Sequence, residues 1–191
     1  MMAVYDLADP TMRLPQQLVV DTSLLLALRP MDDNPRAAAA QAFVRRMGEW
    51  ITNYEMVAWL PLPVLQECYH VILANSLRRI WEAMDTTTRP PNWVKVYKDQ
   101  PDLLRACTPE LSRFRALLAA IPMTPVTPEN LVTSAVVEPL EERMHHFITT
   151  YRLFPQDALI LAHAERLGVY AVATLDRDWR RASAFDVYTC L

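Results

Sequence analysis

Glycine is scarce in this chain, with only Gly48 and Gly168 among its 191 residues. The dinucleotide-binding loop GxGxxG and the phosphate-binding loop GxxxxGK[ST] both need several glycines, because their backbones approach phosphate closely. The sequence therefore excludes both loops. Any chemistry on phosphate groups would depend on side chains and metal ions instead.

The chain also has few cysteines, no excess of basic residues and no long apolar run. Cys68, Cys107 and Cys190 are widely spaced, which favours reduced cytoplasmic thiols over a disulfide framework or a zinc site. The net charge of −3 argues against a protein that coats nucleic acid non-specifically. The first residues do not resemble a signal peptide, and no segment is typical of a membrane span. These features predict a cytoplasmic protein that does not enter a membrane.

Short apolar stretches alternate with helical ones along the chain. This alternation predicts an α/β fold with a mainly parallel central sheet. Strands are expected at residues 17–21, 56–60, 123–127, just after Gly168, and 185–189, the last of these at an edge of the sheet. Helices are expected at residues 24–28, 35–53, 64–75, 109–120, 129–137, 139–151 and from 155 to Gly168.

The length of the chain fits one α/β domain with a proper core. Residues 1–16 are polar and interrupted by prolines, which predicts a flexible N-terminal arm. Residues 17–191 are expected to form the single domain. Within it, the pattern loosens at about residues 76–105, which predicts an inserted segment.

Four acidic residues fall where the expected strands and helices meet. Asp21 ends the first strand, and Asp176 lies just past the strand that follows Gly168. Glu67 and Asp157 lie in the first turns of helices. Because the carboxyl ends of parallel strands share one edge of a sheet, these carboxylates are expected to lie there together. Such a cluster is unfavourable without cations, because the carboxylates repel one another. A bound Mg²⁺ or Mn²⁺ ion, which prefers oxygen ligands, would offset this repulsion.

Each of these acids also has a purely structural interpretation. Asp21 could cap the helix that follows it, and Asp176 could cap a short terminal helix. Asp157 could interact favourably with the dipole of its helix, and Glu67 could be a solvated helix residue. These interpretations do not require the four acids to share one edge, whereas a metal site does.

Four segments of the chain resemble, in order, the segments of PIN domains. They read VVDTSLLLAL, PVLQECYHVI, PQDALILAHAERLG and VATLDRDW. The resemblance is closest to the VapC-type toxin ribonucleases and extends from about Gln17 to Thr189. It implies a PIN-like three-layer α/β/α fold with a central, mainly parallel sheet. The gap between Glu67 and Asp157 is longer than in the compact toxins of this kind.

The resemblance implies a metal-dependent endoribonuclease that binds one or two Mg²⁺ or Mn²⁺ ions. The metal ligands and catalytic residues would be Asp21, Glu67, Asp157 and Asp176, with Asp178 as an additional candidate ligand. Asp178 could equally be a solvated turn residue.

Hydroxyl and basic side chains complete the expected site. The hydroxyls that could orient carboxylates or the scissile phosphate are Thr22, Ser23 and Thr174, although Thr22 and Ser23 could serve only as local caps. The basic residues best placed by sequence to bind RNA are Arg29, Arg177, Arg180 and Arg181.

Three functional hypotheses follow for this chain. The resemblance favours a ribonuclease that is the toxin of a toxin–antitoxin pair, bound by a small antitoxin protein and forming a homodimer. The second hypothesis is a PIN-like module that binds RNA or protein with little or no turnover. The third is a nuclease that acts on structured DNA.

Overall fold

The computed structural model describes residues 3–29, 36–132 and 138–190. It divides into two compact units, which are described separately. The first comprises Met1–Leu65 and Ile121–Leu191, and the second comprises Gln66–Ala120.

The first unit is built on a six-stranded sheet in the order β1-β6-β5-β2-β3-β4. Every strand pairing is parallel, as expected from the alternation of strands and helices. The strands are β1 (Val4–Asp6), β2 (Gln17–Val20), β3 (Val57–Leu60), β4 (Thr124–Pro125), β5 (Ala171–Ala173) and β6 (Asp186–Thr189).

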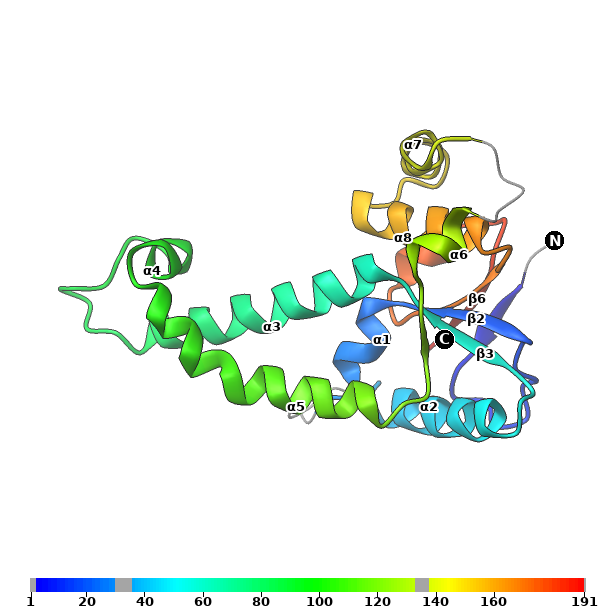
Figure 1. The fold of residues 1–191 in the computed structure, drawn as a ribbon, viewed down its shortest axis with the longest axis horizontal. Helices are drawn as coiled ribbons and strands as arrows, with labels where there is room; N and C mark the ends of the chain where they lie inside the picture. The colour runs from blue at the N-terminus through cyan, green and yellow to red at the C-terminus, as the bar shows by residue number, and fades with distance from the viewer. Residues whose placement is uncertain (1–2, 30–35, 133–137, 191) are drawn as a thin grey trace. The chain divides into compact units, whose positions relative to one another are not determined.

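Helices cover both faces of this sheet, which confirms the three-layer α/β/α fold class. In Figure 1, α2 lies on one side of the strands, and α7 and α8 lie on the other. The helices of this unit are α1 (Thr22–Ala27), α2 (Ala37–Thr52), α6 (Pro128–Val132), α7 (Leu140–Tyr151), α8 (Pro155–Arg166) and the 3-10 helix η2 (Arg177–Arg181). Helix α3 also begins in this unit.

The central strands are apolar because both of their faces are covered. Leu18, Val19 and Val20 of β2 are fully buried, and so is Val172 of β5. Trp179 of η2 is fully buried as well. The continuous apolar run in β2 ends at Asp21, where the chain leaves the sheet.

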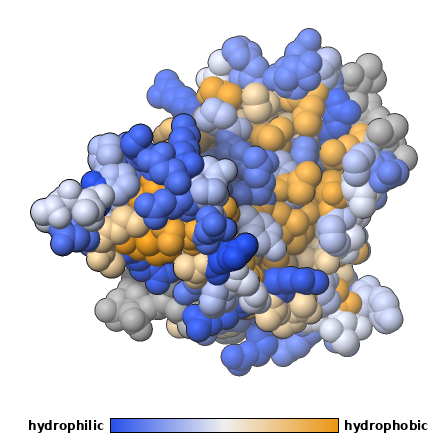
Figure 2. Space-filling view, turned by 60° about the vertical axis from the view of Figure 1, so that its left-hand side comes forward, coloured by the Kyte–Doolittle hydropathy of each residue, from blue (hydrophilic) through white to orange (hydrophobic). Residues whose placement is uncertain are grey.

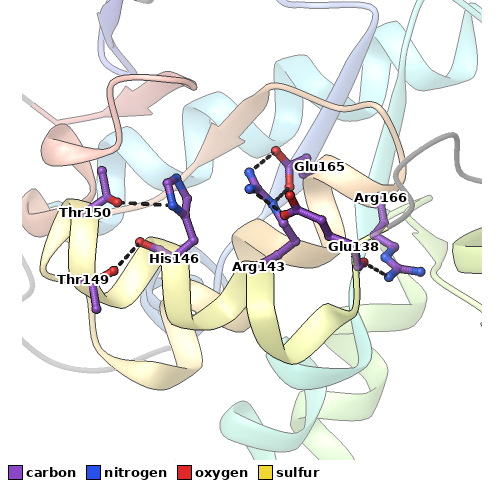
Figure 3. Close-up of polar contacts among 7 residues, drawn as sticks. All are labelled: Glu138, Arg143, His146, Thr149, Thr150, Glu165 and Arg166. Carbon is purple, nitrogen blue, oxygen red and sulfur yellow. Dashed lines mark hydrogen bonds and ion pairs between the residues drawn. The ribbon is translucent and has the colours of Figure 1, made fainter.

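Helices α7 and α8 are joined by an ion pair (Figure 3). The Arg143 guanidinium donates from Nε and Nη2 to the two carboxylate oxygens of Glu165, both at 2.6 Å. It also donates to Glu138 at 3.0 Å, and Arg166 donates to the carbonyl of Glu138. These bonds attach α8 to α7 near the end of α8 that is remote from Asp157.

The second unit is mostly helical. It contains most of α3 (Leu62–Glu82), α4 (Trp93–Asp99), the 3-10 helix η1 (Pro101–Cys107) and α5 (Thr108–Ala119). Its apolar interior includes Ile72, and the Phe114 ring packs edge-on against Tyr69 with ring centroids 5.5 Å apart. The unit extends beyond the insertion predicted at residues 76–105, and α3 continues past the expected helix end near residue 75.

Two sequence-based expectations about the sheet are wrong. The segment expected to be a flexible arm contains strand β1, which pairs with β6 from Val4↔Val187 to Asp6↔Thr189. The amide of Leu7 extends this pairing by donating to Thr189 O at 2.9 Å. Consequently β1 forms the edge of the sheet, and β6 does not.

The helix expected at residues 129–137 corresponds to α6, which covers Pro128–Val132. Residues 133–137 lie outside the described residues.

Polar side chains cover much of the face shown in Figure 2, with apolar side chains reaching the surface between them. The large apolar side chains exposed in the first unit include Tyr54, Leu62 and Phe154. Within the described ranges, no helix combines the length and the apolar character that crossing a membrane requires.

Candidate functional site

The order of the strands creates a switch point between β2 and β5. The chain runs from β2 outward to β3 and β4, and then returns to β5 on the other side of β2. In open parallel sheets, ligands bind outside the carboxyl ends of the strands at such a point. Val20 of β2 pairs with Ala173 of β5, so the residues that follow them, Asp21 and Thr174, emerge side by side there.

A hydrogen-bond network links these two strand ends. Oδ2 of Asp21 accepts from Oγ1 of Thr174 at 2.7 Å and from Oγ of Ser23 at 2.6 Å. Each hydroxyl in turn accepts from a main-chain amide: Leu175 N donates to Ser23 at 2.8 Å, and Asp176 N donates to Thr174 at 2.9 Å. The two hydroxyl protons therefore point at Asp21, which is held as an acceptor.

Burial and hydrogen bonding act on Asp21 in opposite directions. Asp21 is 3% exposed, and burial raises the pKa of its carboxyl. The bonds from Ser23 and Thr174 lower that pKa but offset the burial only in part. A buried carboxylate that is held as an acceptor, with its negative charge poorly solvated, suits a hard divalent cation as a ligand.

Asp176 and Asp178 lie just beyond β5. Asp176 is half-buried and caps η2, because its Oδ1 accepts from Asp178 N at 2.8 Å. Asp178 is exposed and forms an ion pair with Arg181 at 2.7 Å. Asp21 also acts as a cap, since its Oδ2 accepts from Ser23 N at the start of α1. The capping interpretations of Asp21 and Asp176 are thus confirmed, and capping does not preclude a second role.

Asp157 lies in the first turn of α8 and is half-buried. The neighbouring side chain shows where this turn is fixed: Nε2 of Gln156 donates to Pro63 O at 2.7 Å. Pro63 lies in the first turn of α3, three residues after Leu60 ends β3. The first turn of α8 therefore lies at the same edge of the sheet as Asp21.

Glu67 lies in α3, one helical turn after Pro63, and is half-buried. It belongs to the second compact unit, whereas Asp21, Asp157 and Asp176 belong to the first. Its role as a fourth carboxylate of the site remains a prediction.

The structure does not gather the predicted acids into a finished metal site. Within residues 3–29, 36–132 and 138–190, no three His, Cys, Asp or Glu side chains form a group that could hold a metal ion. The capping bonds give a physical reason for part of this. They turn the carboxylate of Asp21 toward Ser23 and that of Asp176 toward the amide of Asp178.

The basic candidates differ in their surroundings. Arg180 donates to Cys190 O at 2.9 Å, and Arg181 is paired with Asp178. Arg177 is exposed and Arg29 is half-buried. Of the predicted hydroxyls, Thr22 is buried, while Ser23 and Thr174 belong to the network around Asp21.

Two residues near the site were not among the sequence-based candidates. Arg36 donates to Leu175 O at 2.8 Å, which brings a guanidinium beside the segment that links Thr174 to Asp176. Gln156 anchors the first turn of α8. The sequence places Arg36 at the start of an expected helix, but no local pattern shows that it contacts Leu175.

Comparison with known proteins gives one family. The family model described as PIN domain matches residues 18–184. Among solved structures, the chain is similar to the crystal structure of VapBC2 from Rickettsia felis bound to a DNA fragment from their promoter. The TM-score is 0.46 at 10% sequence identity, and the match covers 91% of this chain and 98% of that chain. No match is found among the curated proteins.

Proposed function

Because the chain belongs to the PIN domain family, whose members are generally metal-dependent nucleases, we propose that it is a Mg²⁺- or Mn²⁺-dependent endoribonuclease. The observation that carries the proposal is the hydroxyl network that holds the buried carboxylate of Asp21 as an acceptor at the switch point. The ordered resemblance of four segments to VapC-type toxins supports RNA as the substrate. It also supports a role as the toxin of a toxin–antitoxin pair.

In this proposal the metal ligands are Asp21, Asp157 and Asp176, with Glu67 as the fourth carboxylate that the resemblance implies and Asp178 as an additional one. A bound divalent cation would lower the pKa of a water molecule and offset negative charge at the phosphodiester. Oxygen ligands of this kind suit both Mg²⁺ and Mn²⁺.

The protein's own groups keep the site oriented. Ser23 and Thr174 hold Asp21 in one direction, and their own orientation is set by the amides of Leu175 and Asp176. Hydrogen-bonded support of this kind commonly orients metal-binding carboxylates. Removing one hydroxyl should therefore weaken metal binding without removing a ligand.

Arg36 supplies positive charge next to the proposed acidic ligands. Its guanidinium is directed to the site by its bond to Leu175 O, one residue before Asp176. A guanidinium is planar and matches the geometry of a phosphate. We assign Arg36 a role in positioning the RNA backbone.

One observation favours a second candidate, a PIN-like module that binds RNA or protein without turnover. The described part of the chain contains no group of three acids ready to hold a metal ion. An enzyme would have to bring its carboxylates together on metal binding, whereas a binding module would not.

Cleavage assays with purified protein separate these candidates. Labelled single-stranded RNA and structured DNA are incubated with wild-type protein in Mg²⁺, Mn²⁺ or EDTA. The proposal expects RNA cleavage with either metal and none in EDTA. Asp157→Asn should lower the rate by a factor of at least about 100, as expected when a ligand of a catalytic metal is lost. Glu67→Gln tests the fourth carboxylate in the same assay.

The matched control is Asp102→Asn, which neutralises an aspartate whose side chain is 87% exposed. It should cleave at the wild-type rate. Equal cleavage by wild type and Asp157→Asn would contradict the site, and cleavage of structured DNA alone would contradict the substrate. RNA binding without cleavage in either metal would favour the module.

A further inference from the structure

Phe154 occupies a position that neither capping nor burial explains. It is the N-cap residue of α8, where Ser, Thr, Asp and Asn are preferred, and it makes no side-chain capping bond. Its side chain is 74% exposed. The two residues before it link α7 to α8, and Asp157 lies three residues further along. An exposed aromatic ring therefore stands one helical turn before Asp157 of the proposed site.

Arg152 is held nearby in an unusual conformation. It ends α7 with φ 55° and ψ 42°, the left-handed region that usually takes glycine or asparagine. Leu153, between the two exposed residues, is 4% exposed and anchors the linker in the core. Within the described residues, the Arg152 side chain makes no hydrogen bond or ion pair.

The linker is fixed on both sides, so these exposed side chains have a defined place. On one side, α7 is bonded to α8 through Arg143 and Glu165. On the other, Gln156 donates to Pro63 O at 2.7 Å, which fixes the first turn of α8 at the carboxyl edge of β3. Because Arg152 and Phe154 are two residues apart, their Cα atoms lie within about 7 Å of each other.

We propose that Phe154 and Arg152 bind single-stranded RNA next to the cleavage site, an inference that rests on the proposed ribonuclease function. The Phe154 ring stacks on an unpaired base, and the Arg152 guanidinium contacts a backbone phosphate. Aromatic rings combined with cations are the usual means of holding single strands, because every base has a face that can stack. The positive end of the α8 dipole adds to the attraction of phosphate at this point.

Binding measurements test the two roles separately. The protein carries Asp157→Asn to prevent cleavage, and the probes are fluorescent single-stranded homopolymer RNAs in Mg²⁺ at several salt concentrations. Phe154→Ala should raise the Kd about five- to 150-fold, the equivalent of the ~1–3 kcal/mol measured for one stacked base, and leave the salt dependence unchanged. Phe154→Trp should restore binding.

Arg152→Gly tests the phosphate contact, with a residue that fits the left-handed backbone. It should reduce the slope of log K against log salt by about 0.7, the value expected when the protein neutralises one phosphate fewer on a single strand. The matched controls are Tyr54→Ala, which removes an aromatic side chain that is 98% exposed before β3, and Arg45→Ala on α2. Neither control should change the Kd beyond about twofold, since both lie away from this edge.

The outcomes distinguish this inference from the ribonuclease proposal. If wild type cleaves RNA while Phe154→Ala and Arg152→Gly bind and cleave normally, the inference is overturned and the nuclease stands. If wild type neither binds nor cleaves RNA, both are overturned. If Phe154→Ala abolishes capture of a protein partner but leaves RNA affinity intact, the linker contacts protein and the inference also fails.

Discussion

Asp21 shows how one residue can serve both the fold and the proposed chemistry. Its carboxylate caps α1 and also accepts two hydroxyl hydrogen bonds that only an acceptor can satisfy. Burial favours the uncharged form of the Asp21 carboxyl and raises its pKa above the ordinary value of 3.8. Ionising Asp21 therefore costs more free energy in the folded protein than in the unfolded chain, as is common at functional sites.

This cost predicts that Asp21→Asn stabilises the metal-free protein at neutral pH. A raised pKa means that the folded state binds the proton more tightly than the unfolded state. The wild type thus loses stability as the pH rises from about 4 through the pKa of the folded state. The amide carries no charge and should unfold with a free energy higher by on the order of 1 kcal/mol at pH 7. Urea denaturation in EDTA at pH 4 and pH 7 measures the difference.

The same comparison includes Asp102→Asn, which removes an exposed charge and should leave the free energy of unfolding within about 0.5 kcal/mol of wild type. The advantage of Asp21→Asn should be smaller at pH 4, where the folded-state carboxyl with its raised pKa binds the proton and the unfolded-state carboxyl, with its ordinary pKa of 3.8, is about half protonated. An advantage of equal size at both pH values would show that ionisation of Asp21 is not its cause.

At this scale the sequence predicted which residues emerge at the strand ends, including Asp21 and Thr174. It could not predict where their side chains point, because capping and rim placement both fit the same positions. The roles of Arg36 and Gln156 depend on contacts with Leu175 and Pro63, which are 139 and 93 residues away in sequence. No local pattern contains such information.

Among the elements, α8 carries the largest share of the proposed site. Its first turn holds Asp157 and the Phe154 N-cap, while its last turns are bonded to α7. Arg143 and Glu165 form that bond with side chains only 19% and 14% exposed. Hydrogen bonding by Glu165 raises the pKa of Arg143, so the pair stays ionised.

We expect Arg143→Ala to lower the free energy of unfolding by about 1–3 kcal/mol, because Glu165 would be left partly buried without its partner. The matched control is Arg113→Ala, which breaks the pair with Glu110 on α5, where the arginine side chain is 69% exposed. Exposed pairs contribute about 0–1 kcal/mol, so this variant should unfold almost like wild type. Thermal and urea denaturation compare the two, and equal losses would mean that α7 and α8 are not held by this pair.

The long apolar and amphipathic segments made most elements predictable, including α2, α5, α8 and β2. The errors fall on the sheet's far edge. Strand β1 has only three residues, too few to show the alternation that identifies a strand. Its pairing with β6 joins the two ends of the chain, so local sequence could not place it.

At the scale of the whole molecule, membership of the PIN domain family confirms the resemblance read from four short segments. The parallel order of the sheet brings the ends of β2 and β5 together, although more than 150 residues separate Asp21 from Thr174. The segment between Glu67 and Asp157, long for a compact toxin, includes most of a helical unit with an interior of its own. Spacing indicated that extra structure exists there, but not that it forms a compact unit.

Metal binding should be visible in the stability of the whole chain, independently of any substrate. A cation that binds only the folded protein adds RT ln(1 + [L]/Kd), about 2.7 kcal/mol at a concentration 100 times the Kd. We therefore expect Mn²⁺ and Mg²⁺ to raise the unfolding temperature of wild type in proportion to the logarithm of their concentration. The effect should be larger at pH 8 than at pH 5, because the proton favoured by the raised pKa of Asp21 competes with the metal.

Asp157→Asn should lose most of this stabilisation and Asp102→Asn should keep it, while Ser23→Ala should need a higher Mn²⁺ concentration to reach the same shift, because its Kd is higher. Thermal unfolding at graded Mn²⁺ concentrations measures all four proteins side by side. Because no RNA is present, the result does not depend on which nucleic acid the protein cleaves. A metal-induced shift of the same size in wild type and Asp157→Asn would place the cation elsewhere in the molecule and contradict the proposed ligand set.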